Sequence, residues 1–417
     1  MKVINQNSTR VILADDAKFK SFKIIVSFHT PLGEEYATLN ALLLNVLKTS
    51  CKKYPSKEKL ALALDELYGA QLESFTQKTG GHLLPSLSLD FVSSKYAGED
   101  QLKNAFDLLN EIVFYPDTMN GIFKNDIFEI EKENLIRDIQ SLFNDKRVYA
   151  LQQCLKYTCG DDPYGAGTKG SIEICRNITA ERLVSHYDYI LTKCNSTIVV
   201  VGDFDIDEAE KLSSEFSKKV GSGENIKSSI LPKREKAQYI NETSEITQGK
   251  LVMSFTTDIG EDKKRQAESV LNGIFGGTVS SKLFNVVREK MSLCYYASSR
   301  FDKYKGLIIA QCGIDCGNYD KTVKAVIEQM LAVQDGSFTD EEFNNTVSSL
   351  TSSSQMVADS LSDLVTFYHN QATSDEVLTP SELIDKYNSV TREQVIELAA
   401  LIKLNTVYFL CGEKEGN

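Results

Sequence analysis

Hydrophobic and polar side chains alternate along residues 23–28, and the alternation then gives way to helical spacing. Ile24, Val26 and Phe28 fall on one face of an extended chain, and the residues between them fall on the other. Residues 38–48 are strongly apolar, with seven apolar positions of eleven, which is typical of a helix buried on most of its sides. The pattern therefore predicts a strand, a polar turn through Gly33 and a buried helix.

A second helix is predicted to begin at Ser56, whose hydroxyl can accept a hydrogen bond from a free backbone N–H, and to end at Gly69. Alternation at Leu87, Leu89 and Phe91 predicts an antiparallel sheet with one covered face. The same patterns predict the other elements of the first half: strands at 74–77 and 83–91, helices at 101–113 and 121–142, and a loop at 160–165.

The pattern of residues 23–45 recurs at residues 250–272, at a constant offset of 227 positions (250 − 23). Six of the first twelve aligned pairs are identical, and four more exchange one aliphatic residue for another. Both halves also end alike, because a helix capped by Thr179 or Thr391 leads into an apolar strand that stops at glycine. An internal repeat of this length predicts two homologous domains.

The predicted fold is α+β, with two homologous domains that each hold a mainly antiparallel sheet covered by helices. The domains are expected at 1–217 and 248–417, joined by a polar, charged linker at 218–247. The second domain is predicted to contain a helix that ends at Gly276–Gly277, a helix at 280–290, strands at 295–301 and 306–314, a capping box at 339–342 and a further helix through the serine-rich stretch 348–354.

Composition narrows the function classes. The 417 residues carry 46 basic and 58 acidic side chains, a net charge of −12 that argues against nucleic acid or an anionic membrane as the main partner. The N-terminus lacks signal-peptide features and no apolar run reaches the ~18 residues of a membrane span, so we expect a cytoplasmic protein. Nine scattered cysteines fit reduced, buried thiols better than disulfides.

Motifs for common catalytic chemistry are missing from the sequence. It has no Gly-x-Ser-x-Gly elbow and no phosphate-binding or dinucleotide-binding glycine pattern. The four histidines, at positions 29, 82, 186 and 369, are dispersed, and no two stand four residues apart as metal ligands on one helix would.

Three stretches resemble the M16 metallopeptidase family, the group of pitrilysin, insulinase and the processing peptidases. The most specific is 280–295 (SSKLFNVVREKMSLCY), which is similar to the family signature Ser-x-Leu-Phe-x-x-Val-Arg-Glu-x-x-x-Leu-x-Tyr. The others are 67–70 (LYGA) and the segment that runs from Asp162-Pro-Tyr-Gly165 through Gly170 to 201–203. The resemblance covers nearly the whole chain and implies a duplicated α/β roll.

The resemblance also shows what is lost. Active members carry His-x-x-Glu-His on the first-domain helix, where two imidazoles hold Zn²⁺ and the glutamate is the general base. That motif falls on Ala41, Leu44 and Asn45, which include neither histidine nor glutamate. The family's third ligand position is occupied by Asp138, seven residues after the retained Glu131, which places both carboxylates on one helix face.

Arg288 and Tyr295 match the arginine and tyrosine that, in the family, bind the substrate backbone near the scissile carbonyl. A guanidinium and a phenol are both donors that can stabilise a developing oxyanion. The plainer alternative is that Arg288 pairs with a surface carboxylate and Tyr295 only begins a strand. The adjacent Tyr296 could also be the family tyrosine.

The loss of the zinc-binding residues and the retention of Arg288 and Tyr295 together predict a non-catalytic subunit with no cofactor of its own. By resemblance, it would pair with an HxxEH-bearing M16 subunit that supplies Zn²⁺, bind peptide or unfolded polypeptide by edge-strand addition, and complete the partner's active site. In isolation it could form a homodimer, and it should not hydrolyse peptides alone.

Two other functions stay open from sequence. One is a zinc peptidase with an unorthodox ligand set such as Asp138 with His29 or His82. The other is a scaffold or assembly protein in which Arg288 and Tyr295 are relics.

Overall fold

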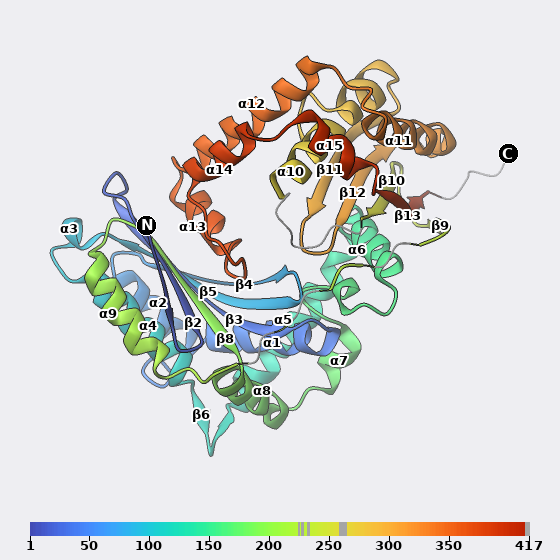
Figure 1. Ribbon diagram of the computed structural model, residues 1–417. Coiled ribbons are helices and arrows are strands. Elements are labelled where there is room, and N and C mark those ends of the chain that lie inside the picture. Colours follow the sequence, from blue (N-terminus) through green and yellow to red (C-terminus); the bar gives the residue numbers. More distant parts are fainter. Residues whose placement is uncertain (224–225, 227–228, 232–233, 258–264, 413–417) are drawn as a thin grey trace. The chain divides into compact units, whose positions relative to one another are not determined.

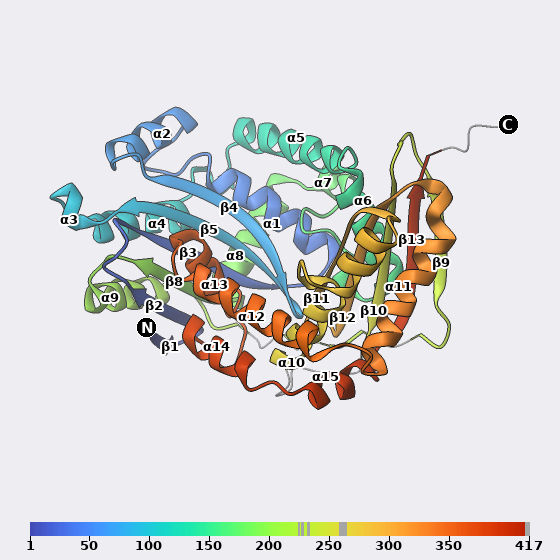
Figure 2. The same ribbon diagram turned by 90° about the horizontal axis from the view of Figure 1, so that it is seen from above.

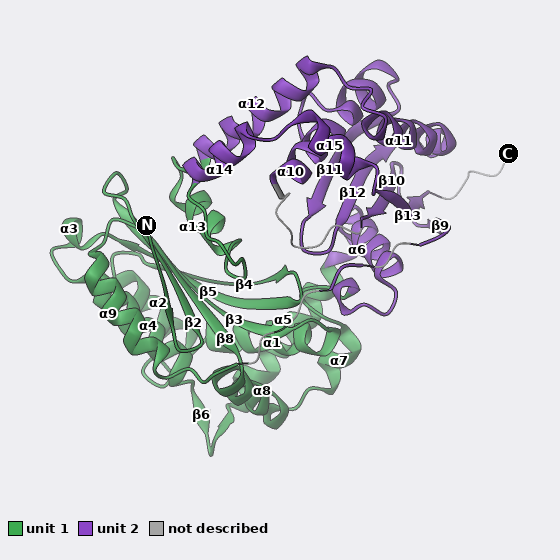
Figure 3. Ribbon diagram, in the orientation of Figure 1, with its two compact units in different colours: residues 1–141, 166–227, 357–379 green, residues 142–165, 228–356, 380–417 purple. Residues whose placement is uncertain are grey.

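The computed structural model describes residues 1–412 except 224–225, 227–228, 232–233 and 258–264 (Figure 1). The chain forms two compact units, shown in different colours in Figure 3. Unit 1 comprises residues 1–141, 166–227 and 357–379, and unit 2 comprises residues 142–165, 228–356 and 380–417. Neither unit is one continuous stretch, so the units differ from the contiguous domains expected at 1–217 and 248–417.

Unit 1 is built on a six-stranded sheet with the order β1-β2-β8-β3-β5-β4. All neighbours pair antiparallel except β2 and β8, which run parallel. The mainly antiparallel sheet predicted for the first domain is thereby confirmed. Its strands are β1 (Lys2–Gln6), β2 (Thr9–Asp15), β3 (Ser21–Pro31), β4 (Gln71–Thr79), β5 (His82–Val92) and β8 (Asn195–Gly202), and a small ribbon is formed by β6 (Thr118–Met119) and β7 (Ile122–Phe123).

Helices cover one face of this sheet and enclose the main core of the unit. Leu42 of α1, Phe106 of α4 and Phe22 of β3 belong to one continuous apolar cluster. The predicted caps are confirmed, since Ser56 and Thr179 each accept a backbone N–H at a helix start. The helices of unit 1 are α1 (Glu34–Leu47), α2 (Lys57–Glu66), α3 (Ser94–Ala97), α4 (Gln101–Phe114), α5 (Asn125–Leu142), α7 (Ile172–Asn177), α8 (Ala180–Lys193), α9 (Ile206–Ser217) and α13 (Leu361–His369).

The other face of the sheet is covered as well, which the prediction of one covered face missed. Leu364 and Tyr368 of α13 pack there in a second apolar cluster with the strands. His369 hydrogen-bonds Ser27 at 2.6 Å, and Ser27 in turn bonds Ser86 at 2.8 Å. Because β5 presents small serines to this face, its alternation looks like a pattern of buried and exposed positions although Ser86 is fully buried.

Unit 2 repeats the arrangement around a five-stranded sheet with the order β11-β12-β10-β13-β9. Strand β10 pairs antiparallel with β12 and β13, just as β3 pairs with β5 and β8, so the internal repeat is a structural repeat. The repeated turn at Gly260 lies outside the described residues. The strands are β9 (Gln238–Thr243), β10 (Gly249–Thr256), β11 (Cys294–Asp302), β12 (Leu307–Ile314) and β13 (Lys403–Cys411). Strand β9 lies inside the stretch expected to be a linker.

Helices also enclose the core of unit 2, and both sides of its sheet are covered. Cluster residues such as Phe255, Phe275 and Val395 fill one side, while α6 lies on the other, where Thr158 hydrogen-bonds Ser254 at 2.7 Å. The capping box of Thr339 and Glu342 is present as predicted. The helices are α6 (Lys146–Cys159), α10 (Arg265–Asn272), α11 (Tyr319–Gln334), α12 (Asp340–Val357), α14 (Pro380–Asn388) and α15 (Arg392–Ala399), with π-helical turns at η2 (Gly273–Gly277) and η3 (Leu283–Lys290) and 3₁₀ turns at η1 (Pro163–Gly165) and η4 (Cys316–Asn318).

Each unit therefore takes one covering helix from the other half of the sequence: α13 lies in unit 1 and α6 lies in unit 2. Together with the sheets and helices above, this confirms an α+β fold with two similar parts. Among the described residues, no helix is both long enough and apolar enough to span a bilayer.

Candidate functional site

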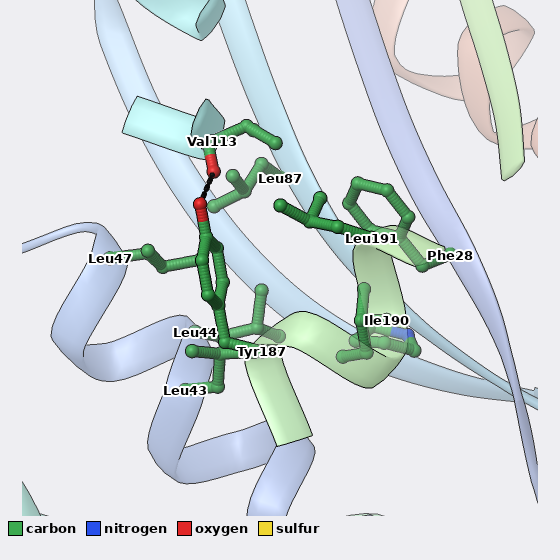
Figure 4. A pocket seen from close by; sticks show the side chains of 10 residues that line it. Phe28, Leu43, Leu44, Leu47, Leu87, Val113, Tyr187, Ile190 and Leu191 are labelled. Carbon is green, nitrogen blue, oxygen red and sulfur yellow. Dashed lines mark hydrogen bonds between the residues drawn. The ribbon is translucent and has the colours of Figure 1, made fainter. Parts of the chain in front are cut away.

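The two sides of helix α1 have different surroundings: one lies in the apolar core and the other lines an open pocket. Leu44 is only 6% exposed and, with Leu43 and Leu47, lines a closed apolar cavity of about 20 Å³ (Figure 4). Across that cavity Tyr187 donates its hydroxyl to the carbonyl of Val113 at 2.9 Å, so the polar end of the phenol is satisfied. The position that corresponds to the family's general base is thus part of the hydrophobic core.

Asn45, one residue further, faces an open pocket that we call the α1–α5 pocket (Figure 2 shows α1, α2 and α5). It has a volume of about 530 Å³ and combines polar and apolar walls. It is lined by Asn45, Lys48 and Thr49 at the end of α1, Lys57, Leu60, Ala61 and Leu64 of α2, Leu72 of β4, and Glu131, Asn134, Arg137 and Asp138 of α5.

Glu131 and Asp138 both line this pocket, as their seven-residue spacing on one helix predicts. Glu131 is 7% exposed and accepts hydrogen bonds from Thr49 at 3.0 Å and from Asn134 at 3.1 Å. Asp138 is more exposed and forms an ion pair with Lys169 at 2.9 Å. Each carboxylate is therefore engaged by the protein itself.

Gly170 explains how Lys169 reaches that position. Its φ of +73° lies in the left-handed region, and a Cβ there would come within 1.8 Å of the Thr38 hydroxyl oxygen on α1. Next to it, the backbone N–H of Ser171 donates to the same hydroxyl at 3.1 Å. The close crossing of this segment over α1 places Lys169 beside Asp138.

The donor set around α1 does not fit zinc. Ala41 and Leu44 offer no lone pair, and an amide oxygen from Asn45 with the ion-paired carboxylate of Asp138 cannot replace two imidazoles and a glutamate. Within the residues that the structure describes, no three histidine, cysteine, aspartate or glutamate side chains come together as a metal site. The unorthodox set of Asp138 with His29 or His82 is accordingly not assembled.

Three of the histidines, His29, His186 and His369, are instead buried in unit 1, and His82 is partly buried there. His29 shares a 2.9 Å hydrogen bond with Thr197, and its ring meets that of His82 edge-on at 5.3 Å. His186 bonds the Asn40 side chain at 2.8 Å. Burial lowers the pKa of His29 and of His186 to about 3, so both rings are neutral at neutral pH.

Arg288 and Tyr295 both lie on the surface of unit 2, each with its own neighbours. The Arg288 guanidinium stacks on Phe284 at 4.6 Å and pairs with Glu289 at 3.4 Å, yet its side chain remains 38% exposed. Tyr295 is 59% exposed and donates its hydroxyl to Asp315 at 2.8 Å, and that bond raises the pKa of the phenol.

Tyr296, the alternative to Tyr295, points elsewhere. The guanidinium of Arg147 lies 4.5 Å from its ring centre, and burial raises the pKa of Tyr296 to about 12. The register between β11 and β12 shifts between Cys294 and Tyr296, a bulge that leaves Tyr295 as the extra residue facing solvent. Sequence alone could not separate two adjacent tyrosines, because the bulge has no local signature here.

Sequence reasoning also missed the cations of the α1–α5 pocket. Lys48, Lys57 and Arg137 come from three separate elements and belong to no motif. Their common position follows only from the packing of α1, α2 and α5, so spacing along the chain gives no signal for it.

Comparisons with known proteins bear on this arrangement. The family model described as "Peptidase M16 inactive domain" matches residues 177–350. The "probable inactive metalloprotease YmfF" of Bacillus subtilis strain 168 is 30% identical over 402 residues, which cover 95% of this chain and 94% of that protein.

Solved structures show the same fold over the full chain. A conserved protein from Enterococcus faecalis V583 has a TM-score of 0.89 and 29% identity, with coverage of 100% of this chain and 99% of that one. A peptidase M16 inactive domain from Pseudomonas fluorescens has a TM-score of 0.81 over 100% and 99% of the two chains, and at 19% identity it shows the fold alone. The chain belongs to the M16 metallopeptidase family, as a homologue of proteins described as inactive.

Proposed function

We propose that this chain is a non-catalytic M16 subunit that binds peptide substrate and completes the active site of a zinc-bearing M16 partner. The observation that carries the proposal is a contrast between two sites. The zinc-ligand positions on α1 have no suitable donors, whereas the donor-bearing side chains of Arg288 and Tyr295 remain at the surface.

The chemistry of the two retained residues supports this role. Among the residues that the structure describes, Arg288 has one polar partner, the carboxylate of neighbouring Glu289, which leaves most of its five N–H donors for a substrate. Tyr295 donates its one proton to Asp315, and a substrate oxygen would have to take over that bond. In a zinc peptidase, donors of this kind stabilise the oxyanion that forms at the scissile carbonyl.

The edge of the first sheet supports peptide binding. Strand β4 stands last in the sheet and pairs only with β5 among the described strands. An extended peptide can add to such an edge through main-chain hydrogen bonds, and side-chain pockets then provide specificity. The α1–α5 pocket, which includes Leu72 of β4, lies beside this strand.

The test is reconstitution with an HxxEH-bearing M16 chain encoded by the same organism. We expect the isolated chain to contain far less than stoichiometric zinc and to cut no peptide, and the mixture to cleave in a chelator-sensitive way. Arg288→Ala and Tyr295→Phe should each lower kcat about 100-fold, the usual effect of losing one oxyanion donor. Matched controls are Lys290→Ala on the same turn and Tyr239→Phe on β9, both exposed.

Two results would replace the proposal. Stoichiometric zinc with chelator-sensitive cleavage by the chain alone would indicate a peptidase with other ligands. Full activity of the complex with both Arg288→Ala and Tyr295→Phe would indicate a scaffold in which these residues are relics.

A further inference from the structure

The α1–α5 pocket is lined by Asn45 and Asp138, which stand at positions matched to zinc ligands by the family resemblance, yet its charged side chains favour an anion. We infer that it binds the carboxylate of a peptide. This inference names the group that the pocket recognises and rests on the peptide binding proposed above.

The charges that line the pocket are the first argument. Lys48, Lys57 and Arg137 contribute three positive charges, and Glu131 and Asp138 contribute two negative ones, so the lining carries 3 − 2 = +1. The ion pair with Lys169 further offsets Asp138. The sign of this lining charge is opposite to the net charge of the chain, which is −12.

The cations are also available. Within the described residues, the side chains of Lys48 and Lys57 form no ion pair or hydrogen bond, and the neighbouring Glu58 does not line the pocket. Lys57 is the first residue of α2, a ten-residue helix, so the positive end of the helix dipole adds to its charge. Neither lysine has to break a contact to bind an anion.

Arg137 is oriented for this task by a chain of hydrogen bonds. Its guanidinium donates to the side-chain oxygen of Asn134, and the amide nitrogen of Asn134 donates to Glu131. The hydroxyl of Thr49 lies 3.0 Å from the other oxygen of Glu131, so each oxygen of this carboxylate has a neighbour that can donate to it. Arg137 keeps donors that can bind a carboxylate in the two-pronged geometry typical of arginine.

The other wall of the pocket fits a peptide residue. Leu60, Leu64 and Leu72 provide apolar surface opposite the cations, and Leu72 belongs to the edge strand β4. A volume of about 530 Å³ lies within the usual range for a small-ligand site. A peptide that extends along β4 would therefore bring an apolar side chain and a carboxylate into the pocket together. That carboxylate belongs either to the C-terminus or to an aspartate or glutamate side chain.

The experiment is fluorescence anisotropy with the isolated full chain and N-terminally labelled ten-residue peptides, up to millimolar concentration. One pair of peptides differs only in a free or amidated C-terminus, and a second pair differs only in an internal Asp or Asn. We expect one of these changes to weaken binding about tenfold, as for loss of a charge-assisted hydrogen bond. If amidation weakens binding, the bound carboxylate is that of the C-terminus. If replacement of Asp by Asn weakens binding, it is that of a side chain.

The variants Arg137→Gln and Lys57→Gln should each weaken binding of the preferred peptide about tenfold and remove most of its advantage over the uncharged form. Lys59→Gln is the matched control, because it removes the same charge from an exposed position of α2 that does not line the pocket. Thermal unfolding by circular dichroism checks that each variant is folded.

Equal binding of charged and uncharged peptides, no binding of any peptide, or unchanged affinity in Arg137→Gln and Lys57→Gln would overturn the inference. The reconstituted activity with Arg288→Ala is independent of these results. A chain that completes the partner's site but shows no preference for carboxylates keeps the proposed function and loses only this inference.

Discussion

Helix α1 of unit 1 and the residues Arg288 and Tyr295 of unit 2 differ in how much of the family's pattern they keep. On α1 the position of the general base is a leucine whose side chain fills an apolar cavity. On unit 2 both polar residues stay on the surface, held by Glu289 and Asp315. The apolar cores of both units lie between the sheets and their helices, away from Arg288 and Tyr295, so we expect the fold to depend on those cores more than on the site residues.

The two units also differ in how strongly we expect low pH to destabilise them. All four histidines lie in unit 1. Burial lowers the pKa of His29 and His186 to about 3 and that of His369 to about 4, against an ordinary value of 6.5. Below pH 6.5 these imidazoles become protonated in the unfolded chain but stay neutral in the folded chain. The free energy of unfolding is therefore highest above pH 6.5, and it decreases as the pH falls toward the pKa values of the folded state.

The largest effect that we expect is the pH dependence of the free energy of unfolding of unit 1. Between pH 8 and pH 5, each of the three buried histidines should remove about 2 kcal/mol from the free energy of unfolding of unit 1, about 6 kcal/mol in all. Urea unfolding at both pH values, with limited proteolysis and mass spectrometry, measures the loss and assigns it to a unit. His369→Gln should reduce the pH dependence by about one third. A loss that falls first on unit 2 would contradict this account.

The next effect tests the two faces of α1. Leu44→Glu should destabilise unit 1 by about 4 kcal/mol, because it places a carboxylate in a cavity whose lining is apolar. Asn45→Glu is the matched variant: the same acid, one residue on, faces Lys48 in the open pocket and should cost less than about 1 kcal/mol. Urea unfolding at pH 7.5 measures both. Similar values for the two would mean that Leu44 is not part of the core.

Unit 2 offers a buried charge for comparison. Lys305 is 1% exposed and contacts Asp162 at 3.3 Å and the carbonyl of Ser229 at 3.0 Å. Lys305→Met should lower the free energy of unfolding of unit 2 by about 3 kcal/mol, since it leaves the carboxylate of Asp162 without its cationic partner, with only the Tyr164 N–H and the Ser229 hydroxyl, among the described residues, to donate to it. Adding Asp162→Asn should restore a good part of the loss. If the double variant is less stable than the single one, the pair does not account for the effect.

The smallest effect concerns the retained donors. Arg288→Ala and Tyr295→Phe should each change the free energy of unfolding by less than about 0.5 kcal/mol, because both side chains are exposed and their ion pair or hydrogen bond lies in water. Thermal unfolding measures this directly. A loss above 2 kcal/mol in either variant would indicate a structural reason for its retention and would weaken the proposed substrate role.

Local features of the fold were predictable from sequence. The strand at Ile24–Phe28, the cap at Ser56 and the capping box at Thr339 depend on residues within a few positions of one another, and all three are present. The repeat at an offset of 227 made the second sheet predictable from the first.

Features that depend on distant partners could not be read in the same way. Nothing in residues 146–159 or 361–369 signals that each helix covers a sheet formed mainly by the other half of the sequence, since any apolar helix face fits several sheets. The buried serine Ser86 looks like an exposed position, and the bulge at Cys294 has no glycine to mark it. In the candidate site, the loss of metal donors at Ala41–Asn45 could be read directly from the sequence. The cluster of cations in the pocket could not, because it forms only when three helices pack together.

The place of α13 in unit 1 has a consequence for biosynthesis. Its residues Leu364 and Tyr368 complete the second apolar cluster over strands that emerge from the ribosome hundreds of residues earlier. Until α13 has been made, the nascent first half carries an open apolar sheet face that is a natural target for chaperones. A messenger RNA truncated after the first half would consequently yield a polypeptide prone to aggregation, although it includes every strand of the sheet in unit 1.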